Sequence, residues 1–247
     1  TRITVPTGAN FVGSASWYIE VSPKDEYIGL EWGESGIWME RRNSAEGLAE
    51  ENSGWRQSTG VWRSEYDMSA NREYYIVVRS RNRSGEVSGE IVVSTYTLAV
   101  EPHTPTVNAG YDIEKGYYSE IGVESDNPAG TEYAITPDNG MTWIGIDEST
   151  SSVVYWSTAS VRRHKGLKSN TEYSYSAKAR NAVGIETMLS GAGSKVTPPP
   201  SPTGVEITGI SATNIDLAWE SVEGASSYGV KASSGEGIWE ETQPSLI

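Results

Sequence analysis

The side chains that most often carry out chemistry in proteins are scarce in this 247-residue chain. It has two histidines, His103 and His164, and no cysteine, so a nucleophile with a neighbouring base, or a zinc site with His or Cys ligands, has almost no material. His103 stands between prolines, and His164 lies in the polar run Val161-Arg-Arg-His-Lys165. Both contexts predict solvated loop histidines. We therefore assign no catalytic residue and expect no enzymatic activity.

Carboxylates are plentiful, and two of them facing each other could hydrolyse a glycosidic bond. However, pairs such as Asp25-Glu26 and Asp147-Glu148 are adjacent in sequence, and adjacent residues of a strand point to opposite faces. Oxygen-rich loops suit Ca²⁺ better, so calcium is the one cofactor left open, and no metal ligand is assigned because no Asp-x-Asp-x-Asp-Gly loop occurs. Asp138-Asn-Gly140 is more simply the tight turn of a hairpin.

Aromatic side chains are the remaining candidates for binding, since the chain has nine Trp and fourteen Tyr but one Phe. Exposed flat rings stack on sugars or anchor protein partners. Trp38 and Trp55 flank a segment, Glu40 to Ser53, that reads as a loop peculiar to this part of the chain. With Trp62 they are the predicted ligand-binding residues. The alternative is that these rings fill cores and cap their ends, since a chain with one Phe must draw its aromatic volume from Trp and Tyr.

The charge balance excludes several classes of partner. With 33 acidic and 19 basic residues the formal charge is −14 and the isoelectric point about 4.6, which disfavours nucleic acid and anionic membrane surfaces. No run of eighteen apolar residues occurs, so we expect no membrane insertion. The basic cluster Arg162, Arg163 and Lys165 is predicted to be a solvated face, with self-association as the alternative.

The elements that would position these side chains come from a repeat. The stretch from Asn71 to Gly85 and the stretch from Asn170 to Gly184 read almost alike. In each, a Tyr opens a run of alternating apolar and polar residues, which predicts a half-buried strand, and Arg-Asn-x-x-Gly then predicts a hairpin turn. Further alternating runs surround Trp32, Ile121 and Trp219. Short predicted strands, with no apolar residues repeating at the 3.6-residue period of a helix, predict tandem antiparallel β-sandwiches of the immunoglobulin-like class.

These residues resemble the fibronectin type III family, which has a Trp at the end of its second strand and a Tyr at the start of its sixth. Trp32, Trp219, Tyr74 and Tyr173 stand at the corresponding positions. The runs from Asn127 to Ile135 and from Gly166 to Tyr173 look like the bacterial branch of secreted and cell-surface proteins, so the resemblance implies an extracellular or cell-surface location. The second module departs from the pattern, with Val123 and Ser125 in place of the Trp, and Trp143 or Trp156 is expected to fill its core.

The pattern divides the chain into four parts: residues 1–6 as the tail of a preceding module or a linker, 7–98 and 99–197 as two modules, and 198–247 as the first half of a third. The spacing from Trp32 to Tyr74 places the matching Tyr of the third module beyond Ile247. A strand from another subunit is one way to complete such a half sandwich. The candidate donor for self-association is the segment Thr1, Arg2, Ile3, Thr4 and Val5, and truncation of a longer chain is the alternative.

The junctions between modules carry mechanical information. Four prolines among residues 198–202 favour a stiff, extended connection, and residues 101–105 hold a milder version. The sequence therefore predicts a non-catalytic spacer of a bacterial secreted or surface protein, or a component of a fibre or surface lattice, whose partners are other modules of the same chain, copies of itself or an extracellular glycan. The alternatives are carbohydrate-binding accessory modules of a polysaccharide-degrading enzyme and a phage or pilus fibre.

Overall fold

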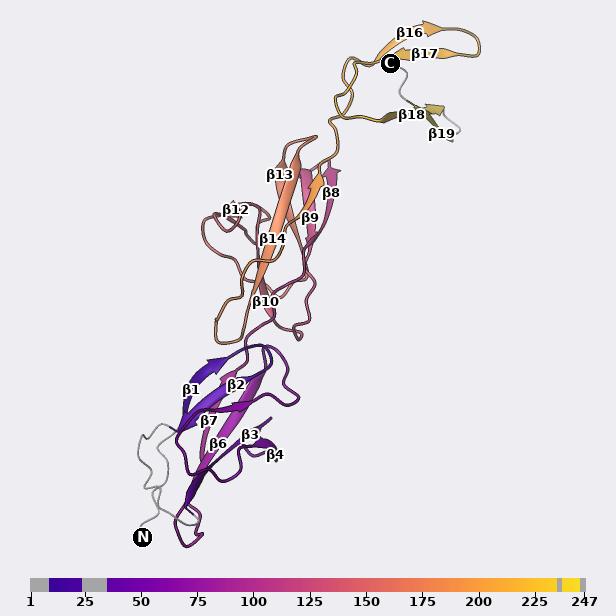
Figure 1. The fold of residues 1–247 in the computed structure, drawn as a ribbon. Helices are drawn as coiled ribbons and strands as arrows, with labels where there is room; N and C mark the ends of the chain where they lie inside the picture. Colours follow the sequence, from indigo (N-terminus) through magenta and orange to yellow (C-terminus); the bar gives the residue numbers. More distant parts are fainter. Residues whose placement is uncertain (1–8, 24–34, 235–236, 245–247) are drawn as a thin grey trace.

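The computed structural model describes residues 9–23, 35–234 and 237–244 and is built from β-strands, with no helix in those ranges. Two complete sandwiches and a smaller four-stranded unit follow one another along the molecule (Figure 1). Since no helix occurs, none that could span a bilayer is present in the part of the chain that the structure describes. The prediction of an all-β chain of tandem sandwiches is confirmed.

The first sandwich packs a three-stranded sheet, in the order β1-β2-β5, against a four-stranded sheet, in the order β4-β3-β6-β7. The chain crosses between the sheets after β2, β4 and β5, which makes the sandwich immunoglobulin-like, of the fibronectin type III kind. Every pair is antiparallel. The strands are β1 (Ala9–Ser14), β2 (Ile19–Pro23), β3 (Gly36–Arg42), β4 (Ala49–Asn52), β5 (Trp62–Ser64), β6 (Glu73–Arg81) and β7 (Ile91–Tyr96).

The second sandwich repeats this plan with sheets β13-β9-β8 and β10-β14-β15, and a small hairpin, β11-β12, lies beside β10. Its strands are β8 (Thr106–Asp112), β9 (Gly116–Gly122), β10 (Glu132–Thr136), β11 (Trp143–Ile144), β12 (Thr150–Ser151), β13 (Val161–Leu167), β14 (Glu172–Arg180) and β15 (Gly193–Val196). The third unit has two separate hairpins, formed by β16 (Glu206–Ile210), β17 (Ile215–Ala218), β18 (Ser227–Ser234) and β19 (Gly237–Pro244).

The predicted hairpins are confirmed. In the first, β6 pairs with β7, and the turn is closed by Asn82, whose side-chain oxygen accepts hydrogen bonds from the main chain of Ser84 and Glu86. Gly85 adopts φ 84°, which a residue with a Cβ reaches only with strain. Asn181 and Gly184 repeat this turn between β14 and β15.

The two cores use the alternation predicted from sequence. In the first, Tyr74, Ile76 and Val78 of β6 are fully buried against Ile19 and Val21 of β2. Trp32 lies outside the described residues.

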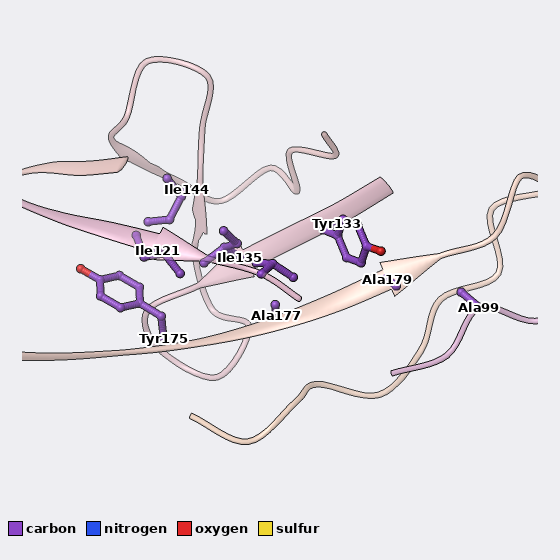
Figure 2. Packing of buried hydrophobic residues seen from close by; sticks show 9 residues of the cluster. Ala99, Ile121, Tyr133, Ile135, Ile144, Tyr175, Ala177 and Ala179 are labelled. Carbon is purple, nitrogen blue, oxygen red and sulfur yellow. The ribbon is translucent and has the colours of Figure 1, made fainter. Parts of the chain in front are cut away.

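In the second core, Tyr175, Ala177 and Ala179 of β14 lie beside Tyr133 and Ile135 of the neighbouring strand β10 and pack against Ile121 of the other sheet, and Figure 2 shows these side chains gathered between the strands. We expected Trp143 or Trp156 to fill the space of the missing Trp, but this cluster contains neither. Its aromatic members are Tyr133 and Tyr175. Trp143 is buried outside this cluster, with the ammonium of Lys178 4.3 Å above its ring, and Trp156 is only half-buried.

A tyrosine hydroxyl fixes the turn before β6 and before β14. The main-chain N–H of Ser69 donates to the hydroxyl of Tyr74 at 2.7 Å, and that of Lys168 donates to Tyr173 at 3.0 Å. This tyrosine corner is a mark of immunoglobulin-like sandwiches. The turns that it fixes hold the residues that connect the sandwiches.

Candidate functional site

The predicted aromatic surface of the first sandwich exists in part. Trp38 of β3 and Trp55, which follows β4, are half-buried neighbours with ring centroids 5.6 Å apart. The guanidinium of Arg81 lies 4.7 Å above the ring of Trp55. One face of Trp55 is therefore covered by a cation, which leaves less of the ring for a sugar to stack on.

Trp62 does not share this surface. It belongs to β5, is 9% exposed, and packs in the first core with Ile19 and Val21. A ligand at the Trp38–Trp55 pair would not reach it, because its ring points between the two sheets.

A buried carboxylate anchors Trp38. Glu40 is 3% exposed, accepts a hydrogen bond from the indole N–H of Trp38 at 2.7 Å, and forms ion pairs with Arg42 and Arg79. Burial alone would raise the pKa of Glu40, but the hydrogen bonds from Trp38 and Arg42 and the charges of the two arginines outweigh it and lower the pKa. The segment predicted as a loop from Glu40 to Ser53 is thus a β3–β4 hairpin tied down by charge pairs.

The arginine-on-tryptophan contact recurs in the second sandwich. There the guanidinium of Arg180 lies 4.6 Å above the ring of Trp156, and Arg180 also pairs with Glu132. The backbone explains the match, because an isolated bridge joins Arg56 to β3 and Ser157 to β10, and each tryptophan directly precedes the bridged residue. Such repetition favours a structural role for Trp55.

The basic cluster and His164 lie differently from the prediction. β13 presents alternate residues to the core, so Arg162 is 9% and His164 8% exposed, while Arg163 faces outward and pairs with Glu120 at 3.1 Å. His164 Nδ1 lies 3.0 Å from the hydroxyl of Tyr175. The solvated-loop interpretation of His164 is wrong, as is the solvated-face interpretation of Arg162. His103 is exposed, beside Asp126.

The joint between the first two sandwiches is the most strongly specified contact between parts of the chain. Asn71, in the turn before β6, reaches the next sandwich with both ends of its amide: Nδ2 donates to Oγ1 of Thr131 at 2.8 Å, and Oδ1 accepts from the main-chain N–H of Ala182 at 2.9 Å. Asn181 Nδ2 in turn donates to the carbonyl of Thr97 at 3.2 Å. These hydrogen bonds cross the joint in both directions.

The linker in this joint is also fastened. Asn127 binds both polar groups of Val100, with Nδ2 donating to its carbonyl and Oδ1 accepting from its N–H, each at 2.7 Å. The N–H of His103 donates to the carbonyl of Glu124 at 2.9 Å, and Ala99 packs into the second core. A linker held at three successive points has little freedom to act as a hinge.

The next joint reuses the same position. Asn170 has φ 47°, close to the 45° of Asn71, and its N–H donates to the carbonyl of Pro198 as that of Asn71 does to Leu98. Its amide lies against Gly224 of the third unit, where an added Cβ would collide with it. The hydroxyl of Tyr117 donates to the carbonyl of Pro199 at 3.3 Å.

The other sequence predictions have these outcomes. The tight turn at Asp138 is confirmed, since Asn139 and Gly140 both have positive φ and the N–H of Met141 donates to the carbonyl of Asp138. It is not the turn of a hairpin, because it connects β10, which pairs with β14, to β11, which pairs with β12. No group of three or more His, Cys, Asp or Glu side chains that could hold a metal lies within the described ranges, and calcium binding stays a prediction. The proposed donor segment, Thr1 to Val5, lies outside the described residues.

Comparisons with known proteins add little. No family model and no curated protein matches the chain. Among solved structures, the FN1–FN3 domains of chicken CNTN1 are 14% identical, with 97% of this chain and 84% of that one covered and a TM-score of 0.35. A two-domain fibronectin type III segment of chicken tenascin is 11% identical, with 78% and 100% covered and a TM-score of 0.44. The strand order and register carry the fold assignment without them.

The joint residues were missed by reasoning from sequence, although a signal was present. Asn71 and Asn170 both stand three positions before the tyrosine that opens the repeated strand. An Asn at matching positions of two repeats suggests a left-handed turn residue. That its side chain faces the next sandwich depends on how the modules stack, which a single repeat does not specify.

Proposed function

We propose that this chain is a stiff, non-catalytic spacer from a bacterial secreted or cell-surface protein assembled from several modules. The observation that supports it most is the joint formed by Asn71, Asn127 and Asn181. The amides of Asn71 and Asn181 each bond to the other sandwich, and the amide of Asn127 bonds to the main chain of the linker between them. A spacer that transmits position needs joints of this kind, whereas a flexible tether would use a free linker.

The hydrogen bonds act together with burial. Thr131, Asn181 and Thr97 are each less than 3% exposed, so breaking the joint would leave buried polar groups without partners unless water entered. Each such group costs about 1–3 kcal/mol when left unpaired. Bending at the joint is therefore opposed by several such penalties at once.

A second candidate is assembly with a further copy of the chain or with another module, and a groove in the third unit favours it. Leu217, Trp219, Tyr228 and Val230 line a groove of about 390 Å³ together with prolines of the preceding linker. Apolar side chains on a sheet face are normally covered by further strands. Added strands from a neighbouring copy would cover this groove, and concentration-dependent oligomers in light scattering are the expected sign.

Small-angle X-ray scattering tests the spacer proposal. The double variant Asn71→Gly/Asn127→Ala removes four hydrogen bonds of the joint, while glycine retains the positive φ of Asn71. We expect the wild type to give the maximum dimension of an extended rod and the variant to give a broader, more compact ensemble.

The matched control is Asn139→Gly, which makes the same exchange at a residue with φ 56° in a turn away from the joint. It should leave the scattering curve unchanged. A wild-type curve that already requires a flexible ensemble would refute the proposal.

A further inference from the structure

One difference between the two sandwiches lies in the strand that follows the crossover from the other sheet, β5 in the first and β13 in the second. In the first, Val21 of β2 pairs with Trp62 of β5, and in the second, Ile121 of β9 pairs with Arg162 of β13. The next register position carries an ion pair in both, Glu20 with Arg63 and Glu120 with Arg163. A guanidinium thus occupies the place of a core indole.

Arg162 has no carboxylate partner among the residues that the structure describes. Its Nη1 donates to the carbonyls of Ile144 and Tyr155 and its Nη2 to that of Tyr133, at 3.2–3.4 Å. Nε is buried and has no hydrogen-bond partner in the described ranges, and the Tyr155 ring lies 5.5 Å from the guanidinium carbon. Three of its five N–H donors are used, and only neutral oxygens accept them.

An uncompensated buried cation is unusual, because burial removes hydration that an opposite charge normally replaces. The desolvation is strong enough to lower the pKa of Arg162 to about 10. Arg163 shows the ordinary arrangement one residue away, since it is half-buried and paired with Glu120.

Arg162 borders a pocket. A cavity of about 390 Å³ lies beside β13, lined by Arg162, by the Tyr155 ring and by the aliphatic residues Ile146, Ala159 and Val161. Ile146 and Val161 are 80% and 53% exposed, so their apolar surface is open to a ligand. The volume lies within the range of roughly 300–1,000 Å³ that small-molecule pockets span.

The acidic residues at the rim already have cationic neighbours. Glu120 accepts two hydrogen bonds from Arg163, and Glu148 lies 3.8 Å from the ammonium of Lys115. The rim therefore adds no net charge that would cancel the attraction of Arg162 for an anion.

We propose that this pocket binds an aliphatic carboxylate, with Arg162 as the counter-charge and Ile146, Val161 and the Tyr155 ring as the surface for the hydrocarbon part. Besides the buried Nε–H, one N–H of Nη2 is unused, and a hydrogen bond from it to a carboxylate would be stronger than the bonds to carbonyls that Arg162 now makes, because it joins opposite charges. A free short-chain acid and the C-terminus of a peptide that ends in an apolar residue present this same chemistry.

Titration by NMR tests the proposal with valerate as the probe and its neutral isostere valeramide as the comparison, at constant ionic strength with chloride. The reporter is the side-chain Nε–H resonance of Arg162, assigned by its absence in Arg162→Met. Saturable movement of this resonance with valerate is expected, with affinity for valeramide about tenfold weaker because the charge-assisted hydrogen bond is lost.

Two variants keep the test decisive. Arg162→Trp installs the residue that the first sandwich has at this position, and it should fold and abolish valerate binding, as monitored by the main-chain resonances of the pocket. Arg163→Gln removes the neighbouring charge and should bind valerate nearly as the wild type does.

Equal binding of valeramide, or binding retained in Arg162→Trp, would overturn the proposal, as would the absence of any saturable shift. N-acetyl-valine distinguishes the two sources. Tighter binding than valerate assigns the site to peptide termini, and weaker binding assigns it to free acids.

Discussion

His164 lies on β13 with its imidazole in the core of the second sandwich, where Nδ1 contacts the hydroxyl of Tyr175. Burial lowers the pKa of His164 below its ordinary value of 6.5, and burial also raises the pKa of Tyr175 to about 12. Both side chains are therefore neutral throughout the physiological range, and their contact is an ordinary hydrogen bond between neutral groups.

The second sandwich should accordingly lose stability in mild acid. Below about pH 6.5 the unfolded chain binds a proton at His164 that the folded chain does not, so the free energy of unfolding falls from there down to the lowered pKa of the folded state. His164→Gln keeps a hydrogen-bonding side chain but does not titrate. Urea denaturation of the wild type and of this variant between pH 7.5 and 5 measures the difference.

We expect the stability of the wild type to fall more steeply with decreasing pH than that of His164→Gln. Parallel curves would show that His164 is protonated equally in the two states, and the buried, neutral assignment would be lost.

The tyrosine corners give a second prediction at single residues. Tyr74→Phe removes a fully buried hydroxyl that accepts a hydrogen bond from the N–H of Ser69, and it should cost the first sandwich about 1 kcal/mol. Tyr173→Phe should cost the second sandwich less, because the two donors are both exposed but Tyr173, unlike Tyr74, is only half-buried, so water can replace its hydroxyl. Chemical denaturation of each variant gives the two values, and the reverse order would contradict this argument.

At the level of elements, the sequence predicted the strands whose faces differ clearly in polarity. Tyr74, Ile76 and Val78 alternate with polar neighbours, and β6 is buried as expected. β13 was missed because Val161-Arg-Arg-His-Lys165 is polar on both faces. Which of its residues turn inward is decided by the register with β9, which places Arg162 opposite Ile121. Register is set by the partner strand and lies beyond the reach of one segment's pattern.

The aromatic prediction failed in part for a related reason. The sequence shows Trp55 and Trp156 at unrelated-looking positions, and only the bridges at Arg56 and Ser157 reveal that they are equivalent. Their partners Arg81 and Arg180 lie at matching positions of the repeated strand. The contact between arginine and tryptophan is therefore repeated in both sandwiches, although only the arginine lies in the segment whose sequence is visibly repeated.

These cation–π pairs should contribute to stability. Arg81→Gln and Arg180→Gln are each expected to destabilise their own sandwich by about 0.5–1 kcal/mol. Arg83→Gln, in the exposed hairpin turn beyond β6, is the control and should have no measurable effect. Urea denaturation is the measurement. A stable Arg81→Gln variant whose Trp55 became able to bind soluble glycans would instead favour a ligand-binding role for that ring.

On the scale of the whole molecule, stiffness depends on a few amides. Asn71 serves the turn of its own sandwich through its backbone and the next sandwich through its side chain. The same backbone conformation at Asn170 brings its amide against Gly224. In each repeat, one asparagine therefore forms the turn before the long strand and also contacts the next unit along the chain.

The central claim is that the first two sandwiches keep one relative arrangement, and the distance distribution between them tests it most directly. The chain has no cysteine, so Ser94→Cys and Ser174→Cys, both exposed strand positions, accept one spin label each for pulsed electron resonance. We predict a single narrow distribution that broadens in the Asn71→Gly/Asn127→Ala background and is unchanged in Asn139→Gly. A broad distribution in the otherwise unaltered chain would contradict the spacer account.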